Sequence, residues 1–102
     1  MIDLLKQKQN EVAELCRRYN VRRLDVFGSA ANGNFDEEKS DIDFFVEFYN
    51  HDTPGIFDRY MDLVENLESL FGKKVDLVTA PSVKNPYFRA SLETSKESVY
   101  AT

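Results

Sequence analysis

A strictly alternating segment at residues 40–48 constrains the fold of this chain more than any other feature. Its apolar positions are Ile42, Phe44, Val46 and Phe48, and the positions between them are Asp41, Asp43, Phe45 and Glu47. A period of two places successive side chains on opposite faces of a β-strand. The segment therefore predicts a strand that buries one face and presents two aspartates on the other.

The patterns around this strand predict a small mixed sheet. Apolar residues at helical spacing predict helices over 2–19 and 54–71, the second with Thr53 as its N-terminal cap and Gly72 as its stop. Strand patterns occupy 21–27, 74–79 and 98–101, with a loop at 30–39 and a short helix at 87–94. We expect one domain over 1–102, of the α/β (α+β) class, with a mixed β-sheet that carries its helices on one face. The other face is then available for a site.

Composition excludes several classes of partner. A net charge of −5 argues against binding a nucleic-acid backbone, and we interpret the small basic cluster at residues 17–23 as a solvated helix end. The sequence has no apolar run near the ~20 residues that cross a bilayer and no signal peptide, so we expect a cytoplasmic protein without a membrane partner. Cys16 stands alone, which leaves no internal disulfide and no cysteine-based metal site.

The aspartate pair suggests a metal site. Side chains two residues apart on a strand are parallel and separated by about 6.6 Å. Asp41 and Asp43 would therefore repel each other unless a cation lies between them, and their hard oxygen ligands favour Mg²⁺ or Mn²⁺. The alternative is that the two aspartates mark the solvated side of an edge strand, which is the commoner case for an isolated Asp-x-Asp.

A Gly-Ser turn favours the metal site over that alternative. Gly28 and Ser29 follow directly on the predicted strand at 21–27. A glycine lets the backbone approach a phosphate closely, and the following N–H groups and the serine hydroxyl can donate to it. A phosphate cradle beside metal ligands is the arrangement that chemistry on a nucleoside triphosphate requires.

The chain here resembles the minimal nucleotidyltransferase family, small relatives of the polymerase-β-type transferases. The resemblance extends over nearly the whole chain and rests on the motifs Phe27-Gly28-Ser29, Gly33, Ser40-Asp41-Ile42-Asp43 and Val75-Asp76-Leu77-Val78. It implies that Gly28 and Ser29 hold the triphosphate of ATP, the nucleotide substrate. It also implies that Asp41, Asp43 and Asp76 bind two Mg²⁺ ions, or Mn²⁺, and that Asp76 helps to activate the attacking hydroxyl.

The resemblance also suggests a biological setting. It implies an enzyme that acts as the antitoxin of a toxin–antitoxin pair, moving AMP from ATP to a hydroxyl of a helical HEPN-type toxin. Two departures leave a rival open, a binding module that neutralises its toxin by contact alone. The family usually carries Arg where this chain has Asn32, and the gap from Ser29 to Asp41 is one residue longer than usual. Transfer to a small molecule is a third, weaker option, and the edge at 98–101 leaves homo- or hetero-oligomers open.

Overall fold

Four strands form one mixed sheet in the computed structural model, which describes residues 3–28, 41–50, 53–79 and 96–102. The strands are β1 (Val21–Phe27), β2 (Ile42–Phe48), β3 (Val75–Thr79) and β4 (Glu97–Ala101), in the order β3-β2-β1-β4. β2 pairs parallel with β3 and antiparallel with β1, and β1 pairs antiparallel with β4. The predicted mixed sheet is confirmed, and the alternating segment is one of its two inner strands.

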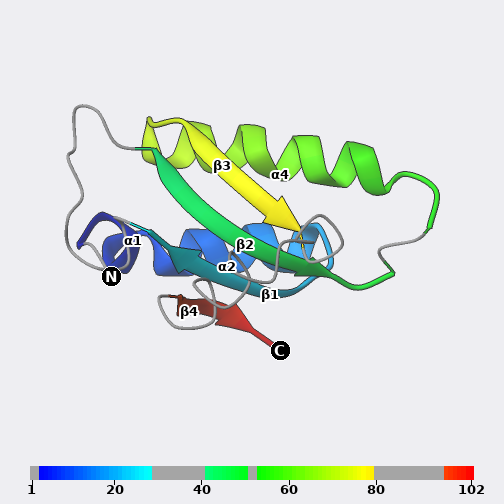
Figure 1. The fold of residues 1–102 in the computed structure, drawn as a ribbon, viewed down its shortest axis with the longest axis horizontal. Coiled ribbons are helices and arrows are strands. Elements are labelled where there is room, and N and C mark those ends of the chain that lie inside the picture. Colours follow the sequence, from blue (N-terminus) through cyan, green and yellow to red (C-terminus); the bar gives the residue numbers. More distant parts are fainter. Residues whose placement is uncertain (1–2, 29–40, 51–52, 80–95) are drawn as a thin grey trace.

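The described helices are α1 (Asp3–Gln7), α2 (Gln9–Arg18) and α4 (Ile56–Phe71), and they cover one face of the sheet (Figure 1). Their buried side chains join those of all four strands in a single apolar core. The members of this core are Leu5, Val12, Cys16, Val21, Leu24, Val26, Ile42, Phe44, Val46, Phe48, Leu63, Leu67, Phe71, Val75, Leu77 and Val99. The expectation of helices packed on one face is therefore confirmed for the described elements.

The predicted helix over 2–19 is interrupted at Lys8, so the prediction of one continuous helix was wrong there. The backbone N–H of Lys8 still donates to Leu4 O at 3.3 Å, and Lys8 O accepts from the N–H of Val12 at 3.0 Å. The hydrogen-bond ladder thus continues through a distorted turn. The apolar pattern could not reveal the break, because the buried residues of α1 and α2 face the same core.

The start of α4 also differs from the prediction, because Thr53 does not cap the helix. The N-cap is Gly55, with φ +89° and no side-chain cap hydrogen bond. The hydroxyl of Thr53 instead donates to Asn50 O at 2.6 Å, which closes the preceding turn. The predicted end of the helix is confirmed: Gly72 is left-handed (φ +64°) and its N–H donates to Glu68 O at 2.8 Å.

The opposite face of the sheet carries a second, small apolar cluster. Phe45 is buried there, with Phe27 and Val78 packed against it. This is the face that β2 turns away from the helices, and it is the face on which the alternating pattern placed Asp43.

Three predicted features lie outside the described residues. They are Ser29, the loop at 30–39 with Asn32, and the short helix at 87–94. In the part of the chain that the structure describes, no helix has both the length and the apolar character needed to span a membrane.

Candidate active site

The site begins where β1 ends. Phe27, the last residue of β1, lies opposite Asp43 in the antiparallel ladder with β2. Gly28 follows with φ +68°, a conformation that residues with a β-carbon rarely adopt. A β-carbon added to Gly28 would lie 2.8 Å from Oδ2 of Asp43. This position therefore needs glycine both for its backbone conformation and for the space that the carboxylate occupies.

The parallel pairing of β2 with β3 brings a second carboxylate to the same place. Asp43 lies opposite Asp76 in this ladder, and neighbouring strands are about 4.8 Å apart. Ile42 and Phe44 on β2, like Val75 and Leu77 on β3, are buried in the main core. Because side chains alternate along a strand, both aspartates point to the face away from the helices. Asp43 is half-buried and Asp76 is exposed.

Asp41 completes the group of carboxylates. It lies one residue before the start of β2 and is exposed. Partial burial raises the pKa of the Asp43 carboxyl above its ordinary value of 3.8, and the negative charges of Asp76 and then Asp41 raise it further. Each carboxylate thus lies within electrostatic reach of Asp43.

This accumulation of negative charge would suit a cation. Within the described ranges, however, no group of three or more His, Cys, Asp or Glu side chains lies close enough together to hold a metal ion. The three aspartates are therefore neighbours without forming a ready-made three-ligand cluster.

Four of the five predicted site residues lie in the described structure, and they meet at one end of the sheet. Gly28 and Asp43 are in contact distance, and Asp43 and Asp76 share a ladder position. Asp41 directly precedes β2. The fifth residue, Ser29, lies outside the described residues.

The sequence family follows from a comparison with known proteins. The profile of the nucleotidyltransferase domain matches residues 10–99 of the chain. The chain belongs to the nucleotidyltransferase family. The resemblance that the sequence motifs indicated is thereby confirmed.

Individual relatives of this nucleotidyltransferase agree with the family assignment. MJ0128 of Methanocaldococcus jannaschii, whose name places it among the protein adenylyltransferases, is 41% identical over 91 residues, which cover 89% of this chain and 86% of MJ0128. Protein adenylyltransferase MntA of Thermococcus cleftensis is 40% identical over 72 residues, covering 71% of this chain and 69% of MntA.

Solved structures share the fold of this nucleotidyltransferase. A minimal nucleotidyltransferase matches with a TM-score of 0.77 and 32% identity, over 94% of this chain and 95% of the other. A chain from a crystal structure of a toxin–antitoxin with AMP-PNP has a TM-score of 0.70 over 92% of this chain and 73% of the other. Its identity is 23%, so this second likeness concerns the fold alone.

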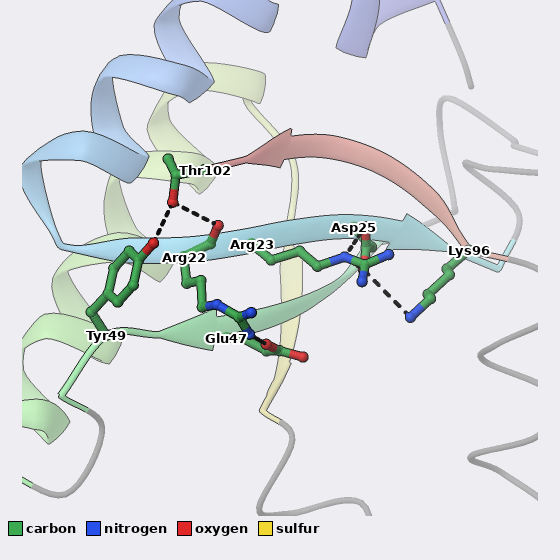
Figure 2. A network of polar contacts seen from close by, with 7 residues as sticks. All are labelled: Arg22, Arg23, Asp25, Glu47, Tyr49, Lys96 and Thr102. Carbon is green, nitrogen blue, oxygen red and sulfur yellow. Dashed lines mark hydrogen bonds and ion pairs between the residues drawn. The ribbon is translucent and has the colours of Figure 1, made fainter.

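One charged residue of the nucleotidyltransferase was not singled out from the sequence. Asp25, on β1, is fully buried (0% exposed) and pairs with Arg23 and Lys96, as Figure 2 shows. The Nε–H of Arg23 donates a hydrogen bond to Oδ1 of Asp25 at 3.2 Å. The same nitrogen lies 3.0 Å from Oδ2 of Asp25, but this contact is an ion pair without hydrogen-bond geometry. Oδ2 of Asp25 therefore accepts no hydrogen bond within the described structure. The ammonium of Lys96 lies 3.8 Å from Oδ2 and 5.6 Å from the centre of the Phe45 ring.

The sequence did contain a signal for Asp25. It lies inside an inner strand, between Leu24 and Val26, which are both buried in the main core. The Asp25 side chain therefore lies on the sheet face that carries Asp43 and Phe45. Whether Asp25 is buried depends on what covers that face. Only the folded arrangement, which brings Lys96 of the C-terminal segment beside β1, reveals its partners.

Proposed function

We propose that this nucleotidyltransferase transfers AMP from ATP to a hydroxyl of a partner protein, a HEPN-type toxin, and so acts as an antitoxin. The observation that carries the proposal is the ladder position shared by Asp43 and Asp76, beside a glycine that leaves room for the Asp43 carboxylate. The names of two relatives contain the words protein adenylyltransferase, and this supports the choice of reaction. The structural likeness to a toxin–antitoxin chain solved with AMP-PNP is compatible with it.

The carboxylates have the chemistry that a divalent cation requires. Asp41, Asp43 and Asp76 supply hard oxygen donors, and their mutual repulsion at Asp43 is the kind that a bound cation relieves. Mg²⁺ typically takes one or two protein carboxylates and fills the rest of its shell with water and substrate phosphates. In the proposed reaction Mg²⁺, or Mn²⁺, supplies positive charge that offsets the charge of the triphosphate.

In the proposed reaction, residues of the chain bind the phosphates and accept the proton of the acceptor hydroxyl. Gly28 and Ser29 hold the phosphates, because a glycine lets the backbone approach a phosphate closely. The acceptor hydroxyl oxygen attacks the α-phosphorus of ATP, the bond to the α,β-bridging oxygen breaks, and pyrophosphate leaves with the electron pair. Asp76 is exposed on the open face, where it orients the hydroxyl and accepts its proton.

A direct experiment tests the proposal. The protein is incubated with a cognate HEPN-type protein, Mg²⁺ and ATP labelled at the α-phosphate, and label on the toxin is measured. We expect transfer by the wild type, none after addition of EDTA, and none from the double variant Asp41→Asn with Asp43→Asn. Glu47→Gln is the matched control, because Glu47 lies on the same strand but pairs with Arg22 (2.8 Å) away from the site.

The rival function is neutralisation by contact alone. Asn32, which stands where the family usually carries Arg, favours it, because an amide cannot replace the bidentate phosphate contact of a guanidinium. Toxin neutralisation that persists in the double variant, with no label transferred by the wild type, would establish the rival and end the proposal.

A further inference from the structure

The strand that carries Asp76 lies at the edge of the sheet, and α4 occupies its outer side. β3 is the first strand in the order β3-β2-β1-β4, so one of its two hydrogen-bonding sides has no strand partner in the described sheet. Figure 1 shows α4 next to β3, which diverges from the helix at an angle. Backbone groups on such an edge need partners from water or from side chains.

Two side chains of α4 hydrogen-bond to the backbone of β3. Oε2 of Glu68 accepts a hydrogen bond from the N–H of Val75 at 3.0 Å. The hydroxyl of Tyr60 donates a short hydrogen bond to Leu77 O. One contact satisfies a donor and the other an acceptor, and both side chains are half-buried.

These two contacts lie on either side of Asp76. Along a strand, successive residues direct their N–H and C=O groups to opposite sides. Val75 and Leu77 therefore direct theirs outward to α4, whereas Asp76 directs its own toward β2, where it is the ladder partner of Asp43. The residues before and after Asp76 are thus each tied to the same helix.

The helix that makes these contacts is itself anchored elsewhere. The guanidinium of Arg59 donates to the carbonyl oxygens of Tyr19 and Asn50. Burial raises the pKa of the Tyr60 phenol, and the charge of Asp76 raises it further. The phenol therefore lies within electrostatic reach of the carboxylate whose strand it holds.

We propose that Tyr60 and Glu68 are positioning residues: they fix β3 against α4 so that the Asp76 carboxylate stays opposite Asp43. The inference rests on the proposed function, in which Asp76 handles the acceptor hydroxyl. Neither side chain contacts substrate in this scheme. Their role is to prevent a small shift of β3, because misplacement of a reacting group by about 1 Å costs on the order of 100-fold in rate.

The test compares variants that remove each contact with variants that keep it. Tyr60→Phe removes only the hydroxyl, Glu68→Ala removes the acceptor, and Glu68→Gln keeps an acceptor oxygen. Asn66→Ala is the matched control, because it deletes an α4 hydrogen bond that does not reach β3. The measurements are amide hydrogen exchange of β3 in metal-free protein, and kcat and KM for transfer with ATP and Mg²⁺.

We expect faster exchange at the Val75 amide in Glu68→Ala, restored protection in Glu68→Gln, and no change in Asn66→Ala. We expect kcat to fall about tenfold in Tyr60→Phe and in Glu68→Ala, with KM for ATP within about twofold of wild type and with rescue of kcat by Glu68→Gln. Asn66→Ala should keep the wild-type kcat.

The outcomes separate this inference from the proposed function. If the wild type transfers AMP, but Tyr60→Phe and Glu68→Ala keep the kcat of Asn66→Ala, the contacts only cover the sheet edge and the inference is wrong. If the wild type transfers nothing, the proposed function is wrong. The hydrogen-exchange measurement alone then tests whether Tyr60 and Glu68 fix β3. Unchanged protection of β3 in Glu68→Ala and Tyr60→Phe would then overturn the inference.

Discussion

Oδ2 of Asp43 lies only 2.8 Å from the point that a β-carbon on Gly28 would occupy. The carboxylate and the backbone turn are therefore packed against each other at the end of β1. The atom in the way is the outer end of a side chain, so a substitution at Gly28 would displace the carboxylate before it displaced the sheet.

Gly28→Ala is therefore expected to abolish AMP transfer while leaving the protein folded. Alanine at φ +68° costs about 1–2 kcal/mol of stability, and its methyl group pushes the Asp43 carboxylate away. Gly72→Ala is the control: its φ of +64° imposes similar strain, but nothing lies within 4 Å of the added β-carbon. Thermal melting should show similar losses for both variants, and only Gly28→Ala should lose transfer. Equal transfer by the two variants would contradict this reading of the contact.

Asp43→Asn is expected to stabilise the protein at neutral pH while removing its activity. The folded state raises the pKa of Asp43 above 3.8, so it binds the proton more tightly than the unfolded chain does. Stability is therefore lost as the pH rises from about 4 through the folded pKa, and the whole penalty is present above it. The variant lacks this penalty.

The measurement is the melting temperature of both proteins from pH 3.5 to pH 8. The variant should melt higher than wild type at pH 8, and the difference should shrink toward about pH 4. Mg²⁺ should raise the melting temperature of the wild type more than that of the variant, because a ligand stabilises the state that binds it. A variant less stable than wild type at pH 8 would show that burial and the neighbouring carboxylates do not destabilise the ionised form of Asp43.

Arg23→Ala should destabilise the fold more than Arg22→Ala, although both arginines lie on β1 and each pairs with a carboxylate. Arg22 pairs with Glu47, and the two side chains are 58% and 30% exposed, so this pair is worth about 0–1 kcal/mol. Arg23 pairs with Asp25, which is 0% exposed; when Arg23 is removed, Asp25 keeps one charged partner among the described residues, Lys96 at 3.8 Å. We expect a loss of about 1–3 kcal/mol, measured by urea unfolding. Equal losses would show that the buried Asp25 does not depend on Arg23.

Cys16 should resist alkylation in the folded protein. Burial in the core raises the pKa of its thiol to about 12, with the nearby Arg17 lowering it only in part. Because the thiolate is the reactive form, iodoacetamide at pH 8 should modify the thiol only after unfolding. Mass spectrometry in rising urea should therefore show modification that follows the unfolding curve. Rapid labelling in native buffer would mean that α2 opens locally.

Much of the fold could be predicted because the patterns were local. Alternation along β2 determined which side chains join the main core, and Gly72 ended α4 where expected. The start of α4 and the break at Lys8 could not be predicted, because several local hydrogen-bonding arrangements suit the same residues. Thr53 can cap a helix or close a turn, and only the folded chain selects the turn.

The sequence by itself determined the chemical groups of this protein: a glycine after a strand, two aspartates in an alternating segment, and a third aspartate on a later strand. Their meeting was decided by tertiary structure. The register of β3 beside β2, which puts Asp76 opposite Asp43, comes from long-range strand pairing that no local pattern encodes. The same holds for the partners of Asp25 and for the two α4 contacts beside Asp76. A periodic pattern records which side chains face the core, whereas register and edge contacts depend on how the strands and α4 pack together.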